Sequence, residues 1–155
     1  MQTNPRSATT TTAGIEKLAE CFRGELSASE TYDLALKNVT HVSVHQTLQE
    51  IYVSHCRRAD QLRDKIRQLG AEPPKSSGVW GAFAKVFQAG ADLLGDRASI
   101  AALEEGEDRM LKVYTTNLDD CDAVTRRFIE TELLPAQQHT HELCRALKGY
   151  VKMTS

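Results

Sequence analysis

The residues of this sequence that could carry chemistry are its five histidines, four cysteines and 21 aspartates and glutamates. Carboxylates and imidazoles together suit iron or manganese, whereas thiolates bind softer metals or form disulfides. The cysteines are widely separated and form no C-x-x-C pair. We interpret them as small hydrophobic side chains, with a redox-formed crosslink between helices as the alternative. They are Cys21, Cys56, Cys121 and Cys144.

His41 and His45 lie four residues apart, a spacing at which two imidazoles on one helix can share a metal ion. No third ligand lies nearby in the sequence. We therefore interpret this pair as solvated or capping histidines.

Length, charge and hydropathy exclude several classes of function. A chain of 155 residues is one domain, and a net charge of −2 is unlike that of a nucleic-acid binder. The sequence contains no run of about 18 apolar residues, so no membrane span is predicted.

Residues 1–12 are polar and lack the apolar stretch of a secretory signal. We therefore predict a disordered tail there and a cytoplasmic protein with reduced thiols. The single domain is predicted over residues 13–152.

Apolar residues recur with helical spacing in four long segments, and no segment alternates as a strand would. The second segment stops at Gly70, and Pro73-Pro74 prevent it from continuing. Asp96 is placed to act as the N-cap of the third. The predicted helices are residues 12–38, 43–69, 97–117 and 122–150.

The connections between these helices predict the topology. Short connections join the first helix to the second and the third to the fourth, so both pairs are predicted to be antiparallel hairpins. The crossover between the hairpins, at about residues 70–96, is long enough to run along a bundle and to contain a short helix. We therefore predict an all-α fold, a four-helix bundle with one long crossover, which is the ferritin-like arrangement.

Polar side chains interrupt the predicted apolar stripes of three helices. His55 lies on the stripe of the second helix, Glu107 on that of the third, and Glu132 and His139 on that of the fourth. A lone carboxylate on a buried face is costly, so Glu107 in particular needs a partner. Pro135 cannot donate a backbone hydrogen bond, so we predict a kink in the fourth helix.

A short pattern, G-E-x6-Y, occurs once on the first helix of each predicted hairpin, at residues 24–32 and 106–114. At these residues the chain resembles the ferritin-like superfamily, because GELSASETY is similar to the first helix of rubrerythrin-type proteins. The helix order and the segments TYDLA, ALEEGEDRMLKVY and QLRDKIRQLG resemble an uncharacterised bacterial ferritin-like family, known as a domain of unknown function. The resemblance covers about residues 14–150 and implies the fold.

The resemblance also implies where metal ligands would lie. Ferritin-like diiron centres use one glutamate on each of two helices and a Glu-x-x-His pair on each of the other two. Glu25 and Glu107 match the two glutamates. The second helix has His55-x-x-Arg58 instead of Glu-x-x-His, and the fourth has His139 preceded by an alanine at the corresponding spacing. Both pairs are therefore broken, and one metal ion on these two glutamates and two histidines is the reduced ligand set that remains.

Arg58 argues against a metal ion, because a guanidinium is always charged, forks onto carboxylates and repels a nearby cation. We interpret Glu25, Glu107, His55 and Arg58 as a buried ion-pair and hydrogen-bond network that replaces a lost metal centre. If Arg58 instead turned its head towards solvent, the four-ligand iron or manganese site would be open, with Glu132 at its periphery.

The segment 78–94 carries an aromatic and aliphatic cluster with one lysine, Lys85. Membrane-surface helices usually carry several basic residues, so we interpret the segment as packing along the bundle, with a homo-oligomer interface as the alternative. Its large apolar side chains are Val79, Trp80, Phe83, Val86, Phe87, Leu93 and Leu94.

The sequence contains no glycine-rich phosphate loop and no nucleophile elbow. The broken ligand motifs favour a non-enzymatic bundle with a structural, stress-related or partner-binding role and no cofactor. The alternative is an iron- or manganese-binding protein, or an oxidase or peroxidase-like enzyme, that uses the reduced ligand set. A small-ligand pocket between the helices is a third possibility.

Overall fold

The computed structural model describes residues 10–154, apart from the side chains of residues 82, 83, 86 and 90–94. All regular structure in this part of the chain is helical, which confirms the predicted all-α class. The predicted tail, residues 1–12, lies largely outside the described residues, and the first helix begins at Thr12.

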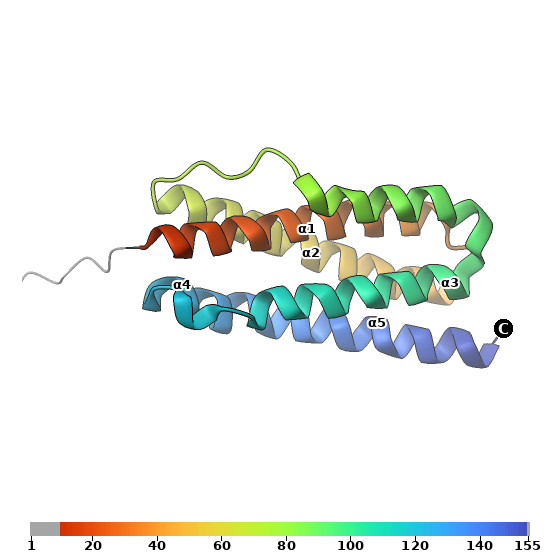
Figure 1. Cartoon of the computed structure of the whole chain (residues 1–155). Coiled ribbons are helices and arrows are strands. Elements are labelled where there is room, and N and C mark those ends of the chain that lie inside the picture. Colours follow the sequence, from red (N-terminus) through yellow and green to blue (C-terminus); the bar gives the residue numbers. More distant parts are fainter. Residues whose placement is uncertain (1–9, 155) are drawn as a thin grey trace, which may run out of the picture.

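The helices follow the predicted order (Figure 1). The second helix begins and ends one residue earlier than predicted. The elements are α1 (Thr12–Asn38), α2 (Val42–Gln68), the 3₁₀ turn η1 (Gly78–Trp80), α3 (Gly81–Thr115), the 3₁₀ turn η2 (Leu118–Asp120), α4 (Ala123–Phe128), the π-helical turn η3 (Ile129–Leu133) and α5 (Leu134–Thr154).

The long helices form a bundle in which each packs against two others. α1 packs on α2 and α3, and α5 packs on α3 and α2. α1 and α2 form a hairpin, and the second part of α3 forms the other hairpin with α5 (Figure 1). This arrangement brings the middle of all four helices together.

The crossover between the hairpins contains a helix, as predicted. The chain leaves α2, passes through η1 and runs along the bundle as the first part of α3 (Figure 1). It reverses at Gly95, where φ is 66° and ψ is 174°. Glycine adopts this positive φ without the steric cost of a β-carbon, so the element named α3 is two helices joined at a sharp turn.

Asp96 follows this turn and was predicted to cap the third helix. Its carboxylate instead contacts the residues just before α2. It accepts hydrogen bonds from the backbone N–H groups of Thr40 and His41, at 3.3 and 3.1 Å. His41 is the N-cap residue of α2, and its side chain makes no capping hydrogen bond. Asp96 therefore brings negative charge to the start of α2, where the helix dipole favours it.

The disturbance predicted around Pro135 takes the form of a π-helical turn. η3, Ile129–Leu133, separates α4 from α5 and ends two residues before the proline. Because Pro135 lacks an N–H, the regular pattern of α-helical hydrogen bonds cannot continue through it. π turns of this kind occur mostly within longer α-helices.

The buried apolar residues form two clusters, one towards each end of the bundle. Leu48 and Ile51 of α2 belong to the first cluster, whereas Leu62 and Ile66 of the same helix belong to the second. Both clusters include predicted stripe residues of the second and third helices. Between the two apolar clusters, the helices bury polar side chains, and these polar side chains form the candidate site.

The described cysteines are all free thiols, and three of the four are buried. Cys144 belongs to the first cluster and Cys21 to the second, in keeping with their interpretation as small hydrophobic side chains.

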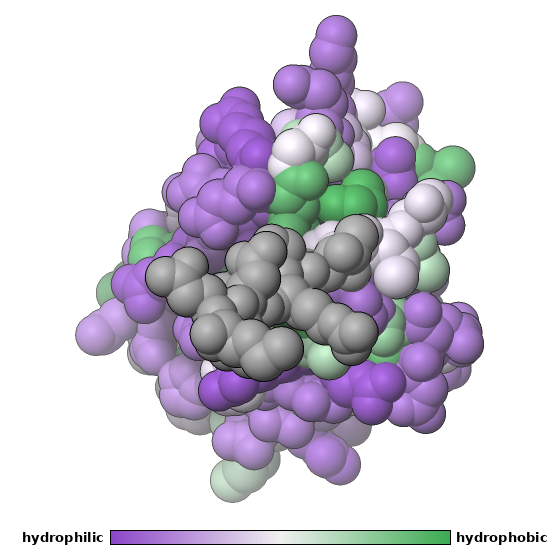
Figure 2. Space-filling model, turned by 90° about the vertical axis from the view of Figure 1, so that its left-hand side faces the viewer, coloured by the Kyte–Doolittle hydropathy of each residue, from purple (hydrophilic) through white to green (hydrophobic). Residues whose placement is uncertain are grey.

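Among the described helices, none has the length and apolar character needed to cross a membrane. At the end of the bundle where α1 begins, the surface visible in Figure 2 is mostly hydrophilic.

Candidate functional site

The centre of the bundle contains a layer of buried polar side chains. Glu25 from α1, Glu107 from α3, and His55 and Arg58 from α2 are each no more than 1% exposed. α5 contributes Gln137 and Thr140, which are also buried. Ionised groups at such depth are destabilising unless they are paired and hydrogen-bonded, so the partners of each group decide what the layer can do.

The carboxylate of Glu25 has three partners. Its Oε1 accepts hydrogen bonds from Arg58 Nε at 2.7 Å and from Tyr114 Oη at 2.5 Å. Its Oε2 lies 2.6 Å from His55 Nδ1. Burial alone would raise the pKa of this carboxyl, but the charges of Arg58 and His55 outweigh it and lower the pKa to about 2.

The carboxylate of Glu107 has four partners, two at each oxygen. Oε1 accepts from Tyr32 Oη and lies near His55 Nε2, both at 2.8 Å. Oε2 accepts from Gln137 Nε2 at 2.8 Å and from Thr140 Oγ1 at 3.0 Å. Burial opposes ionisation here too, but the His55 charge and these donors hold the pKa of Glu107 below its ordinary value.

His55 links the two carboxylates through its two ring nitrogens. An ionised carboxylate can only accept hydrogen bonds, so both ring nitrogens carry protons and the ring is an imidazolium. Burial disfavours that charge, but Glu25 and Glu107 outweigh it and raise the pKa of His55. The ring also stacks on Tyr32, with 5.2 Å between the ring centroids.

Arg58 distributes its donors over acceptors on α1, α2 and α5. Nε donates to Glu25, Nη1 to Ser54 Oγ at 2.7 Å and Nη2 to Gln137 Oε1 at 2.9 Å. Nη2 also lies 2.7 Å from His55 Nδ1. Because that nitrogen carries a proton towards Glu25, we assign the Nη2 hydrogen bond to Gln137. The predicted pairing of Arg58 with a carboxylate is thus formed with Glu25.

The charges of the layer balance. Two carboxylates carry two negative charges, and Arg58 and the His55 imidazolium carry two positive ones. Among the residues that the structure describes, the buried side-chain atom that has no hydrogen-bond partner is Thr10 Oγ1, which does not belong to the layer. Each described polar side-chain group of the layer therefore has a partner.

The repeated G-E-x6-Y pattern forms a reciprocal contact between the hairpins. Tyr32 of α1 donates to Glu107 of α3, and Tyr114 of α3 donates to Glu25 of α1. Burial and the adjacent carboxylates raise the pKa of both phenols well above its ordinary value. A β-carbon on Gly24 would lie 2.4 Å from Met110 Sδ, so the glycine of the first copy permits close packing of α1 and α3.

Of the four predicted metal ligands, the structure brings three together. Glu25, His55 and Glu107 meet in the layer, but the His139 side chain is 60% exposed and its Nε2 lies 3.3 Å from Glu50 Oε1. Its predicted inward orientation is wrong. Glu132, predicted at the periphery of the site, is exposed as well.

The buried row of the fourth helix runs one residue along from the predicted stripe. It includes Ile129, Leu133, Leu147 and Val151, which are all buried. The predicted row is the one on which His139 lies. Both rows are mostly apolar in the sequence, so apolar content alone did not distinguish them.

Gln137 and Thr140 belong to the site although the sequence patterns did not predict them. They stand three residues apart on α5, as His55 and Arg58 do on α2. The roles of Tyr32 and Tyr114 were missed too, although both belong to the repeated pattern. Each copy of that pattern contains one carboxylate and one phenol, which was the available signal for their pairing.

The layer as arranged does not fit a metal ion. Each carboxylate oxygen already has an N–H or O–H partner, and neither nitrogen of His55 has a lone pair free for a ligand bond. Among the described residues, no group of three or more histidine, cysteine, aspartate or glutamate side chains is placed to hold a metal. A ligand set would require Arg58 to move and His55 to lose a proton.

A small cavity lies beside the layer between α1 and α3. Tyr32, His55 and Glu107 form part of its wall, and Trp80 of the crossover lines it as well. Its volume of about 20 Å³ is enough for about one water molecule. The cavity therefore brings space for a water-sized molecule next to the Tyr32–Glu107–His55 side of the layer.

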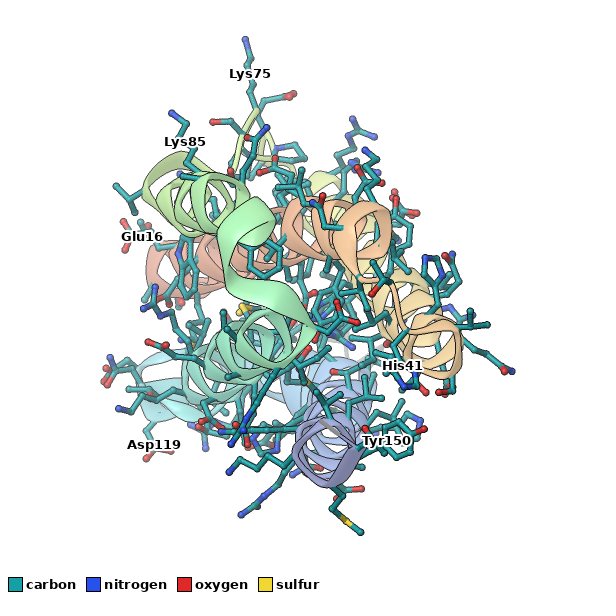
Figure 3. The ribbon with its side chains drawn as sticks, turned by 90° about the vertical axis from the view of Figure 1, so that its right-hand side faces the viewer. Glu16, His41, Lys75, Lys85, Asp119 and Tyr150 are labelled. Carbon is teal, nitrogen blue, oxygen red and sulfur yellow. The ribbon has the colours of Figure 1, made fainter. Side chains whose placement is uncertain are left out.

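His41 and His45 lie far from this layer, near the start of α2. His41 is close to Tyr150 of α5, with 5.7 Å between the ring centroids (Figure 3). Both histidines are exposed, and His45 Nε2 lies 2.7 Å from the backbone oxygen of Leu36, near the end of α1. This contact agrees with their interpretation as solvated or capping histidines.

A protein-family model covers most of this architecture. The model, described as a domain of unknown function (DUF2383), matches residues 13–120, which is more than half of the chain. The chain belongs to this family. The DUF2383 match runs from α1 to η2, so it includes Glu25, His55, Arg58 and Glu107 but not the residues that α5 contributes. Comparison with curated proteins and with solved structures gave no match.

Proposed function

We propose that this chain is a ferritin-like bundle whose buried polar layer takes the place of a diiron centre and joins the four helices without a metal ion. The protein then acts non-enzymatically, in a structural, stress-related or partner-binding role. The observation that carries this proposal is that the charges of the layer balance and its polar groups are hydrogen-bonded to one another.

The positions of the layer residues support a ferritin-like origin. α1 and α3 each contribute one glutamate, as in a diiron bundle. α2 contributes the pair His55 and Arg58 and α5 the pair Gln137 and Thr140, each with the spacing of a Glu-x-x-His pair. The chemistry differs, because the four positions that would complete a ligand set hold a histidine, an arginine, an amide and a hydroxyl.

The electrostatics of the layer support a metal-free role. Glu25 needs a nearby positive charge to stay ionised at this depth, and the Arg58 guanidinium supplies it. A divalent cation placed beside Arg58 would be repelled and would also compete with its hydrogen bonds. The arginine thus does the electrostatic work that iron or manganese would do in a diiron bundle.

Metal analysis tests the proposal directly. Purified protein should contain well under one equivalent of iron, manganese or zinc by elemental analysis, and its melting temperature should not change with EDTA or with added iron(II) or manganese(II). Arg58→His, which removes the fixed charge and adds an imidazole, should gain affinity for these ions in a calorimetric titration. Stoichiometric metal in the unaltered protein, or metal affinity as high as that of the variant, would contradict the proposal.

The convergence of Glu25, His55 and Glu107 beside a water-sized cavity favours one alternative, an iron or manganese oxidase or peroxidase-like activity that uses this smaller ligand set. It requires Arg58 to leave the layer. An iron(II)-oxidation assay separates the two proposals. If the unaltered protein oxidises iron(II) faster than buffer and Glu107→Ala abolishes the difference, the alternative is right.

The partner-binding role includes self-association, in which the segment 78–94 would form the interface between two copies of the chain. Phe87 is buried against the bundle and Trp80 is half-buried, whereas Val79 is 88% exposed. The predicted side chains at Phe83, Val86, Leu93 and Leu94 lie outside those that the structure describes. A concentration series in analytical ultracentrifugation, repeated with Val79→Ser and Trp80→Ala, tests this role. Unchanged sedimentation in both variants would remove it.

A further inference from the structure

A groove separate from the buried layer lies on the surface between α2 and α5. Its volume is about 390 Å³, within the range of about 300 to 1,000 Å³ that small-molecule sites occupy. Its lining includes Glu50, Val53, Ser54, Arg57, His139 and Leu143. The groove therefore has the size of a ligand site, and its side chains indicate which ligand it fits.

Arg57 supplies a cation that is free to bind. Its side chain is exposed and forms no hydrogen bond or ion pair with any described residue. Its neighbour Arg58 differs, because that guanidinium donates hydrogen bonds to Glu25, Ser54 and Gln137. A guanidinium without a partner presents two parallel N–H donors, a geometry that matches a carboxylate.

Ser54 supplies a second donor next to Arg57. Its Oγ accepts a hydrogen bond from Arg58 Nη1 at 2.7 Å, and its own hydroxyl hydrogen has no acceptor among the described side chains and backbone groups. A serine hydroxyl can accept and donate at the same time. The hydroxyl that supports Arg58 from outside the layer can therefore also donate to a ligand oxygen in the groove.

The remaining walls restrict the charge and the shape of the ligand. Glu50 is paired with His139, and its negative charge would repel a phosphate dianion more strongly than a singly charged carboxylate. Val53 is 44% exposed and Leu143 is half-buried, so together they offer apolar surface. One free cation beside one carboxylate and two aliphatic side chains suits a monoanion with an aliphatic part better than a phosphate dianion.

We propose that the groove between α2 and α5 binds a small aliphatic monocarboxylate, with its carboxylate on Arg57 and Ser54 and its tail on Val53 and Leu143. The site is independent of the proposed role of the buried layer, because it needs neither a metal ion nor a particular protonation state of His55. Ser54 connects the two, since it contacts both the bound carboxylate and Arg58.

Titration with hexanoate tests this site. Hexanoate should bind saturably in calorimetry, and the amide signals that shift in ¹⁵N-correlated NMR spectra should belong to α2 and α5 around the groove. Arg57→Ala should weaken binding at least about tenfold, which corresponds to about 1.4 kcal/mol. Arg67→Ala removes another exposed arginine of α2, outside the groove, and should leave the affinity unchanged.

Two further probes test the chemical class of the ligand. Hexan-1-ol retains the aliphatic tail but not the charge, and inorganic phosphate has the charge but no tail, so both should bind more weakly than hexanoate. Ser54→Ala should also weaken hexanoate, with circular dichroism confirming that the variant is folded. The proposal is overturned if hexanoate shows no saturable binding up to about 10 mM, if Arg57→Ala and Arg67→Ala behave alike, or if phosphate binds as tightly as hexanoate.

Discussion

Glu25 and Glu107 stand at equivalent places in the two hairpins, yet their surroundings differ. Glu25 is held by a permanent cation, Arg58, whereas Glu107 is held by the uncharged donors of Gln137 and Thr140. His55 contacts both carboxylates, and each also accepts from the tyrosine of the opposite hairpin. The two halves of the layer therefore solve the same problem, a buried carboxylate, with different chemistry.

The difference shows that two buried carboxylates that share one imidazolium can differ in their other partners, which are a permanent cation at Glu25 and neutral donors at Glu107. His55 contacts both carboxylates and can gain or lose a proton, whereas Arg58 always stays charged. Breaking a buried ion pair leaves an uncompensated charge and costs about 3–5 kcal/mol, but losing a neutral hydrogen-bond partner costs about 1–3 kcal/mol. The Glu25 side should thus be the more sensitive half of the layer.

The largest effect is expected from Arg58→Met, which leaves Glu25 without its permanent counter-ion. The free energy of unfolding should fall by about 3–5 kcal/mol, measured by urea denaturation. Gln137→Met, the matched change on the neutral side, should cost about 1–3 kcal/mol. Equal losses in the two variants would contradict the division of the layer into a charged and a neutral half.

Arg58→Met on its own could prevent folding, so a double variant completes this measurement. Arg58→Met combined with Glu25→Leu removes both charges together and should be more stable than Arg58→Met alone. A double variant as unstable as the single one would show that packing, rather than the unpaired carboxylate, causes the loss.

A smaller difference is expected between Glu25→Gln and Glu107→Gln. Glu25→Gln leaves Arg58 buried without its carboxylate and should cost about 3 kcal/mol. Glu107→Gln leaves His55, which can release its proton, so the cost should be about 1–2 kcal/mol. Thermal unfolding monitored by circular dichroism ranks the two, and the reverse order would show that Glu107 carries the dominant charge pairing.

Stability should also depend on pH differently for the two sides of the layer. The pKa of Glu25 falls from 4.5 to about 2 on folding, so its contribution is complete above pH 4.5 and is lost as the pH falls towards 2. The pKa of His55 rises above 6.5 on folding, so its contribution is complete below pH 6.5 and is lost as the pH rises through the folded pKa.

Chemical denaturation across this pH range, repeated with His55→Gln, checks both signs. The variant should lose the alkaline decline and keep the acid decline. His141→Gln provides a control, because His141 pairs with Asp108 outside the layer and should leave the profile unchanged. An alkaline decline that persists in His55→Gln would assign the titration to another group.

The smallest effects are expected from Tyr32→Phe and Tyr114→Phe. Each removes one hydrogen bond to a buried carboxylate while keeping the ring, so each should cost about 1–2 kcal/mol. The two losses should be similar, since the tyrosines exchange equivalent contacts between the hairpins. A loss in one variant alone would show that the contacts are not equivalent, and the melting temperatures of the two proteins decide this.

The sequence by itself determined the helices of this protein and part of its site. The 3.6-residue spacing of apolar side chains located α1 and α2, and Gly70 marked the end of α2. His55 and Glu107 stood out because a polar residue on an otherwise apolar stripe needs a buried partner. These features depend on short stretches of chain, so a local pattern was enough to predict them.

Only the tertiary structure decided the rotation of α5 and the partners of each carboxylate. Two adjacent rows of that helix could face inward, and the packing of Ile129, Leu133 and Leu147 placed Gln137 and Thr140 in the layer instead of His139. The crossed tyrosine contacts join residues that lie 75 and 89 positions apart in the chain. Local periodicity carries no information about which distant group a side chain meets, because that depends on how the packed helices are rotated against one another.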